Sequence, residues 1–335
     1  MSQSTSMSIP TASPIARQPS EDRSGSFTLI TAADGTTVTA YPLDSFATYG
    51  VIPADWQEDG TLTALTIGQG ITTIGNSAFD GCDNLAGNLV IPSSVTAIND
   101  SAFDTVGSLD GTLTLNEGLL TIGECAFCEC GFTGSLTIPN SVTLIDEEAF
   151  VECEYFNGTL TLGTGLLTIG DSAFEDLDAM TGDLVIPDNV TTIGESAFRG
   201  NGLMTGTLTI GSGLTRIDES VFKWSGFTNT NLVIPTTVTR IDDEAFEDCR
   251  WITGKLVLHA GITLLGEDAF EETFLLTSCD CYIARTIVDN GYNGIFRLSG
   301  ITEIHVPETG AVADTWSAGI QDVSGKSMDV IKDLT

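Results

Sequence analysis

Cysteine is the residue type in this chain best suited to metal binding or redox chemistry, and eight cysteines are present. Cys125, Cys128, Cys130 and Cys153 lie close together in the sequence, and clustered thiolates are ligands that zinc accepts. No histidine is near them, however, and Cys125 and Cys128 are expected in an exposed turn. The sequence therefore disfavours a zinc cluster at these cysteines.

Histidine, the residue most often used as a general base, occurs only as His259 and His305, both toward the carboxyl end. The chain contains no Gly-x-Ser-x-Gly, phosphate-binding loop or His-Glu-x-x-His motif. Cys279 and Cys281 are too close together for a usual zinc knuckle, and either could instead be a disulfide partner in a terminal cap. We therefore predict that the protein is not an enzyme and has neither catalytic nor cofactor-binding residues.

The charge balance is strongly acidic, with 46 Asp and Glu against 12 Lys and Arg and a formal net charge of −34. No Lys or Arg occurs between Arg23 and Arg199. So negative a surface repels phosphate backbones, which predicts that the protein does not bind nucleic acid. The longest apolar runs are far shorter than the roughly 20 residues that cross a bilayer, so we also predict no membrane span.

One row of carboxylates stands three residues before a phenylalanine that recurs about every 24 residues. One interpretation is a short helical turn, whose exposed N–H groups favour acidic residues. The alternative is an edge that binds Ca²⁺, since carboxylates on neighbouring rungs would lie within about 5 Å. No metal site is predicted beyond these calcium candidates: Asp100, Glu124, Glu147, Asp171, Glu195, Glu219, Asp243 and Glu267.

A mixed basic and aromatic group near the end of the repeats is the best candidate for a partner-binding site. Arg216 and Arg240 occupy the same position in adjacent rungs, and the other members are close in sequence. The alternative is that the cations pair with the acidic rows of the same chain. The candidate residues are Arg199, Arg216, Lys223, Trp224, Arg240, Arg250 and Trp251.

The elements that position all these side chains are set by a repeat. Its phenylalanines are spaced by 24 residues, with one step of 23: Phe79, Phe103, Phe127, Phe150, Phe174, Phe198, Phe222, Phe246 and Phe270. Aliphatic residues stand five and eight residues before each Phe, and a Leu-x-(Ile/Leu) segment follows the first eight. Because one rung cannot bury this apolar set, stacked rungs must form a continuous core. The pattern predicts a solenoid of nine rungs with a parallel sheet.

Two local features refine the rung. Gly, Asn or Asp stands four residues before each Phe, which predicts a corner with a left-handed backbone. The strand also ends alternately in Pro, as at Pro92 and Pro139, and in Gly or Asn. The repeat is therefore a double rung of 47–48 residues, and Pro should interrupt a hydrogen-bond ladder on alternate rungs.

Four cysteines and many threonines also follow the repeat. Cys82, Cys130, Cys153 and Cys249 stand three residues after the repeat Phe and are predicted to be buried core thiols. Cys130 and Cys153 are on neighbouring rungs, within reach of a disulfide. The outward strand positions carry mostly Thr and Val, typical of a solvated sheet face. Such an array also resembles ice-binding solenoids, although Asp183 and Lys255 interrupt it.

The pattern Leu-x-Ile-Pro-x-x-Val-Thr-x-Ile-Gly-x-x-Ala-Phe-x-x-Cys resembles the BspA-like leucine-rich-repeat family of bacterial surface proteins and protist proteins. Residues 190–198 are nearly a consensus copy, and residues 301–307 with 311–312 resemble the irregular last repeat of that family. The resemblance covers about residues 61–320. It implies a right-handed solenoid with short turns or helical turns opposite the sheet, and it implies adhesion to host proteins.

We therefore expect a Ser/Thr/Pro-rich disordered tail at 1–26, an amino-terminal cap at 27–60, a solenoid at 61–276 and a carboxy-terminal cap at 277–335. The predicted function is a non-enzymatic binding or adhesion module for a protein or cell-surface ligand, at a cell surface or outside the cell. The absence of a visible signal peptide leaves an intracellular location open. The alternatives are a structural subunit of a larger complex and, thirdly, a Ca²⁺-stabilised or ice-binding solenoid.

Overall fold

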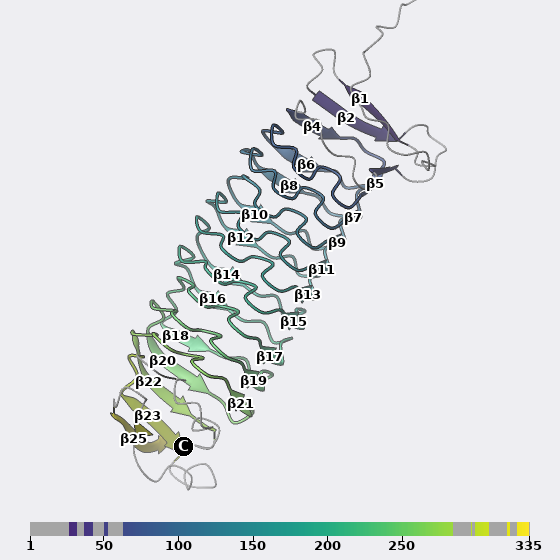
Figure 1. Cartoon of the computed structure of the whole chain (residues 1–335). Helices are drawn as coiled ribbons and strands as arrows, with labels where there is room; N and C mark the ends of the chain where they lie inside the picture. Colours follow the sequence, from purple (N-terminus) through teal and green to yellow (C-terminus); the bar gives the residue numbers. More distant parts are fainter. Residues whose placement is uncertain are drawn as a thin grey trace, which may run out of the picture.

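The computed structural model describes residues 63–283, 296 and 299–307, together with strand segments at 27–31, 37–42, 50–52, 320–321 and 327–334. These residues form an elongated stack of strands and turns that contains no helix (Figure 1). The predicted tail at 1–26 lies outside the described residues, as do residues 311–312 of the predicted last repeat. The predicted parallel solenoid is confirmed.

Each rung contributes two short strands. In chain order the strands are β1 (Phe27–Thr31), β2 (Thr37–Pro42), β3 (Gly50–Ile52), β4 (Ala64–Ile67), β5 (Ile71–Ile74), β6 (Leu89–Ile91), β7 (Ala97–Ile98), β8 (Leu113–Leu115), β9 (Thr121–Ile122), β10 (Leu136–Thr137), β11 (Leu144–Ile145), β12 (Leu160–Thr161), β13 (Thr168–Ile169), β14 (Leu184–Val185), β15 (Thr192–Ile193), β16 (Leu208–Thr209), β17 (Arg216–Ile217), β18 (Asn231–Val233), β19 (Arg240–Ile241), β20 (Gly254–Leu258), β21 (Leu264–Leu265), β22 (Leu276–Cys281), β23 (Glu303–Pro307), β24 (Ile320–Gln321) and β25 (Ser327–Leu334).

The strands follow two sides of the rod (Figure 1). The Leu-x-(Ile/Leu) strands, from β4 through β6, β8 and onward to β22, form what we call the Leu side. The strands that end at the Ile or Leu five residues before each Phe form the Ile side, where β3, β5, β7, β9, β11, β13 and β15 make one parallel sheet. A second sheet on that side contains β17, β19 and β21. The sequence predicted only the Leu side as a sheet.

The core is a column of stacked rings. All nine repeat phenylalanines are 0% exposed, and successive ring centroids lie 4.9–5.9 Å apart in stacked pairs. Such ring pairs are worth about 0.5–1.5 kcal/mol each beyond the area they bury. The column therefore joins every rung to the next, whatever the surface residues are.

The segment around each Phe, which we call the Phe turn, is not the helical turn that was predicted. In the rung of Phe127, the N–H groups of Cys125, Phe127 and Glu129 donate to carbonyls of the following rung at 2.9–3.0 Å. This ladder requires left-handed backbone at Cys125 and Glu129, with φ values of 49° and 52°. Among the described residues, sixteen non-glycine residues have such positive φ, and each stands two residues before or after a repeat Phe. The helical prediction was wrong because N–H groups that a helix would use internally bond between rungs.

The predicted left-handed corner is also wrong. None of the nine Gly, Asn or Asp residues four positions before the Phe has a positive φ. Glycine serves a different purpose there, because a Cβ at Gly123 would lie 2.7 Å from the backbone nitrogen of Asp100. The small residue thus allows the preceding rung to approach closely.

The predicted interruption by proline is confirmed on the Leu side, where β6 pairs only with β8, β10 with β12 and β14 with β16. Leu136 and Ile138 donate their N–H groups to the following rung at 3.0 and 2.9 Å. The intervening N–H groups of the strand face the preceding rung, and at position 139 that donor is missing because the residue is proline. The following rung fits against Pro139 through Gly163, whose Cβ would lie 2.2 Å from the Pro139 carbonyl oxygen.

The cysteines three residues after the Phe are buried as predicted. Cys130, Cys153 and Cys249 donate their S–H groups to the carbonyl of the preceding rung's Phe at 2.9–3.0 Å. Cys130 and Cys153 do not form the disulfide that was considered. Cys279 and Cys281 are likewise free thiols and buried, so neither is the cap disulfide partner that was considered. Burial raises the pKa of Cys153 and of Cys249 to about 12, so these thiols remain protonated at neutral pH.

The ends of the rod are covered by further strands. β1 pairs antiparallel with β2, which pairs parallel with β4, while β3 pairs with β5. At the other end β22, β23 and β25 continue the Leu side in parallel, and β24 pairs antiparallel with β25. Phe296 extends the ring column beyond Phe270 at 6.0 Å. These segments pair with the terminal strands, whose edges would otherwise be open.

Candidate binding surface

The structure divides the seven predicted partner-binding residues between two places. Arg216 and Arg240 lie on the Ile side, where they are register partners in β17 and β19. Asp242 accepts hydrogen bonds from both guanidinium groups, from Arg240 at 3.0 Å. A pocket of about 320 Å³ beside them is otherwise acidic and apolar, with Glu219, Asp243 and Leu264 in its lining. Two like charges therefore share one carboxylate.

The other five residues lie in or just after the Phe turns. Trp224, Arg250 and Trp251 line a second pocket, of about 220 Å³, together with Asp248 and a floor that includes Gly226. The two indoles are 43% and 55% exposed. Exposed Trp beside Arg is the composition that dominates binding energy at protein interfaces.

Cations lie over two aromatic rings of this region, Trp224 and Phe274. The Arg199 guanidinium lies 4.4 Å from the ring centroid of Trp224, and the Lys223 ammonium lies 5.0 Å from it. Arg250 lies 5.6 Å from the Phe274 centroid. These cation–π contacts hold the exposed rings in place and limit the entropy that a partner would have to remove on binding.

Lys223 is the most buried of these cations. Its ammonium contacts the carboxylates of Glu244 at 2.5 Å and Glu247 at 2.8 Å. Burial alone would lower the pKa of Lys223, but hydrogen bonds and charge attraction from the two glutamates raise it above its ordinary value. The hydrogen bond from Lys223 in turn lowers the pKa of Glu244. The cation is therefore fixed in its charged form.

All five predicted cations form ion pairs with acids of the chain. Arg199 pairs with Glu175, Arg250 with Asp248 and Glu272, and Arg216 with Asp218 as well as Asp242. Intramolecular pairing, the alternative considered for these residues, is thus present in the structure. Their contact with a partner stays a prediction.

Sequence reasoning missed three exposed apolar residues of the same region. Leu203, Phe274 and Leu275 are 43–55% exposed, and with Trp224 and Trp251 they form what we call the aromatic face. A signal for it was present, because Leu203, Trp251 and Leu275 all stand five residues after a repeat Phe. The remaining exposed aromatic at that position is Tyr155, in the rung of Phe150.

The eight carboxylates of the predicted calcium row are all exposed. Asp171 accepts the backbone N–H of Glu195 at 3.0 Å, and Asp243 accepts that of Glu267 at 2.7 Å. Acidic residues thus do satisfy exposed N–H groups, but across rungs and not at the start of a helix. Partial burial and the neighbouring carboxylates raise the pKa of Glu147. Calcium binding by the row stays a prediction.

Comparison with known proteins gives the family. The model of the BspA type leucine rich repeat region matches in six copies, over residues 55–177, 108–228 and 215–314. The chain belongs to this family. No curated protein matches the chain.

Solved structures similar to this BspA-type chain come from several bacteria. A leucine-rich repeat protein from Bacteroides ovatus is 17% identical, with 92% of this chain and 75% of that one covered and a TM-score of 0.49. A leucine rich cell surface protein from Faecalibacterium prausnitzii is 20% identical, with 96% and 95% covered and a TM-score of 0.41. The pneumococcal vaccine antigen PcpA is 15% identical, with 92% and 97% covered and a TM-score of 0.36.

The outward face of the Leu side carries Thr and Val, as predicted for this BspA-type repeat. Val90, Val185 and Val233 are 50–67% exposed. Asp183 does not merely interrupt the array, because its carboxylate accepts the backbone N–H of Thr207 at 2.6 Å. Ice binding by this face stays a prediction.

In the part of the chain that the structure describes, no helix has the length and the apolar character that crossing a membrane requires.

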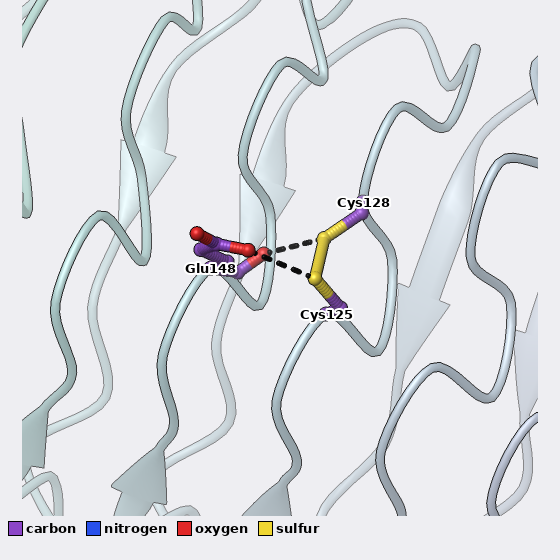
Figure 2. Close-up of side chains that lie close together, drawn as sticks. All are labelled: Cys125, Cys128 and Glu148. Atoms are coloured by element: carbon purple, nitrogen blue, oxygen red, sulfur yellow. Dashed lines mark hydrogen bonds between the residues drawn. A yellow bond between two sulfur atoms is a disulfide. The ribbon is translucent and has the colours of Figure 1, made fainter.

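One further cluster stands apart from the repeat. Cys125 and Cys128 form a disulfide, with their Cα atoms 4.8 Å apart, and Glu148 of the next rung lies beside them (Figure 2). Cys128 is only 4% exposed, so the expectation of two exposed cysteines was wrong for Cys128. Among the described residues, this is the only group of three His, Cys, Asp or Glu whose ligand atoms all lie within 4.8 Å of one another.

Proposed function

We propose that this BspA-type chain is a non-enzymatic binding module that contacts a protein partner through its aromatic face. The observation that carries this proposal is the pair of exposed indoles, Trp224 and Trp251, which both line a pocket of about 220 Å³. Isolated exposed apolar residues need no explanation, but five of them in four consecutive rungs, beside fixed cations, do.

Physical reasoning favours this face over the Thr and Val face. Indole rings bury a large area and lose little conformational entropy. Arg199 already holds the Trp224 ring, and Arg250 holds the neighbouring Phe274 ring. The Thr and Val side chains of the Leu side offer neither large area nor charge. The net charge of −34 would steer basic partners toward the rod as a whole.

We also propose that the protein acts at a cell surface or outside the cell, as the family resemblance implies. Protease added to intact source cells tests this placement. We expect the chain to be degraded without lysis, while a cytoplasmic marker survives. Protection until the cells are lysed would overturn the placement and leave the contact surface to be tested separately.

A pair of matched variants tests the contact surface. Trp251→Ser and Tyr155→Ser each remove an exposed aromatic residue from the same repeat position, four rungs apart. Labelled full chain would be titrated onto cultured cells and immobilised extracellular proteins. We expect Trp251→Ser to weaken binding at least tenfold, as for a central interface residue that contributes about 2 kcal/mol or more. Tyr155→Ser should bind as the parent does.

Equal affinity of the two variants would overturn the proposal that the aromatic face makes the contact. Light scattering on the same samples addresses the assembly-subunit alternative. If the parent chain is an oligomer and Trp251→Ser is a monomer, the face joins copies of the chain, and the protein is an assembly subunit instead of an adhesion module.

A further inference from the structure

Cys125, Cys128 and Glu148 are local departures from the repeat. Two residues before the Phe, five of the nine rungs carry serine: Ser77, Ser101, Ser172, Ser196 and Ser220. The last two rungs carry Glu244 and Asp268 there, and the remaining two, which are consecutive, carry Cys125 and Glu148. Repetition produces rows of like residues, so a set of different ligand-type residues that meet across two rungs requires another explanation.

The three side chains converge on one point. The Cys125 Sγ lies 3.2 Å from the Glu148 Oε2, and all three ligand atoms lie within 4.8 Å of one another. The Cys128 Sγ lies 3.0 Å from the backbone oxygen of Glu148. Figure 2 shows both sulfurs turned toward Glu148. The C-x-x-C spacing on a tight turn lets two sulfurs bind one metal ion.

The equivalent positions in a later rung show what a carboxylate at the position of Glu148 contacts. Ser220, Lys223 and Glu244 occupy the repeat positions of Cys125, Cys128 and Glu148. There Glu244 accepts from Ser220 Oγ at 3.2 Å and from the Lys223 ammonium at 2.5 Å. The carboxylate at this position therefore faces a cation supplied by the chain. In the earlier rung the lysine position holds a sulfur, which can bind a cation from solution.

We propose that Cys125, Cys128 and Glu148 of the reduced chain bind a thiophilic divalent cation of the zinc class, and that the Cys125–Cys128 disulfide closes this site. Binding displaces the two thiol protons and leaves two thiolates and one carboxylate as ligands, with water completing a tetrahedral shell. This site does not rest on the aromatic face or on a protein partner.

Oxidation and metal binding compete for the same two sulfurs. In exchange with a small disulfide such as oxidised glutathione, one thiolate attacks the disulfide and releases one reduced thiol. The second thiolate then displaces the second thiol and closes the Cys125–Cys128 bond. Both electrons pass to the small disulfide, and the metal ion leaves because neither sulfur retains a negative charge.

The other six cysteines are poorly suited to compete for the ion. All are buried and outside any disulfide, and Cys130, Cys153 and Cys249 donate to backbone carbonyls. Burial also raises the pKa of Cys153 and of Cys249 to about 12. Because only the thiolate binds metal, these residues would have to lose both a hydrogen bond and a tightly held proton.

A cobalt titration of the reduced full-length chain tests the site. We expect one Co²⁺ per chain, with the near-ultraviolet band of thiolate-to-cobalt charge transfer and the visible bands of tetrahedral cobalt, and we expect Zn²⁺ to displace it. Cys128→Ser should abolish the thiolate band, and Glu148→Gln should weaken binding at least about tenfold. Cys249→Ser is the matched control, because Ser225 already donates from the same repeat position to a Phe carbonyl.

Oxidised glutathione should abolish binding and produce a Cys125–Cys128 disulfide detectable by peptide mass mapping, and a reductant should restore both. Circular dichroism confirms that each variant is folded. If Cys128→Ser does not fold, the change Glu148→Gln at a half-buried position keeps the test valid. A thiolate band that survives in Cys128→Ser, is lost in Cys249→Ser or persists in the oxidised chain would overturn the proposal. A Co²⁺ affinity of Glu148→Gln that is less than tenfold weaker than that of the parent chain would also overturn it.

Discussion

The rungs up to Phe198 and the rungs beyond it have the same core but different surfaces. Before Arg199 the repeats contain no Lys or Arg, and the sheet of the Ile side is continuous from β3 to β15. Beyond it the Ile side begins a new sheet at β17, whose first residue is Arg216. The ring column crosses this boundary, although the Phe198–Phe222 centroids are 5.9 Å apart and the next pair 5.3 Å.

The difference shows that the repeat fixes the core and leaves the surface of each region free to specialise. In the first region carboxylates face carboxylates, which helps to raise the pKa of Glu147. In the second, Lys223 faces Glu244 and lowers the pKa of that carboxyl. At the boundary, Val221 replaces the alanine that precedes the Phe in the other eight rungs. Its larger side chain fits the wider ring spacing there.

The largest expected effect tests whether the two regions share one core. Phe150→Ala and Phe246→Ala each remove a fully buried ring from the column. Each should lower the free energy of unfolding by about 3–5 kcal/mol. Urea denaturation followed by circular dichroism would give both values. Costs that differ by more than twofold would show that the core is not equivalent on the two sides.

A smaller effect is expected at the boundary itself. Asn201 takes the position of the core cysteines, and its amide accepts from Leu177 N–H at 3.1 Å and donates to the Phe174 and Phe198 carbonyls at 3.0 and 2.8 Å. Asn201→Ala leaves these buried groups unpaired, which should cost about 2–3 kcal/mol of unfolding free energy. Cys249→Ser keeps its donor and should cost less than about 1 kcal/mol. If Asn201→Ala and Cys249→Ser lower the unfolding free energy by similar amounts in the same urea experiment, the hydrogen bonds of Asn201 do not stabilise the boundary in particular.

These residues also show what could be predicted from the sequence. The Phe spacing predicted the rungs and their core, because a repeated apolar set that one rung cannot bury is buried only when the rungs stack. The left-handed positions were misplaced, because Gly123 is small to admit the preceding rung and not to adopt a positive φ. The Cys125–Glu148 cluster and the Lys223–Glu244 pair could not be predicted. Both depend on which residues of one Phe turn lie opposite which residues of the next. The backbone hydrogen bonds between successive Phe turns set this alignment, and a helical turn would not form them.

The smallest effects should have opposite signs in the two regions. Glu147→Gln removes a charge that its neighbours repel, and should raise the unfolding free energy at pH 7 by at most a few tenths of a kcal/mol, because solvent screens the exposed pair. Glu244→Gln removes the partner of Lys223 and should lower it by about 0.5–1 kcal/mol after the same screening. Thermal unfolding of both variants at pH 7 measures the signs. The same sign in both would contradict the comparison.

The pH dependence of these two variants follows from the pKa shifts. The pKa of Glu244 is below 4.5 in the folded chain, so its stabilising effect is present above pH 4.5 and is lost as the pH falls through the lowered value. The pKa of Glu147 is above 4.5, so its cost is present at neutral pH and disappears as the pH falls through the raised value. The advantage of Glu147→Gln should therefore vanish at a higher pH than the deficit of Glu244→Gln.

We propose above all that contact with a partner belongs to the region beyond Phe198. Site-specific photo-crosslinking tests it most directly, with benzoylphenylalanine placed at Trp251 or at Tyr155 of the full chain on intact cells. Both positions are exposed and equivalent in the repeat. We expect a discrete adduct from position 251 and none from position 155. Adducts of equal yield from both positions, or an adduct from position 155 alone, would contradict it.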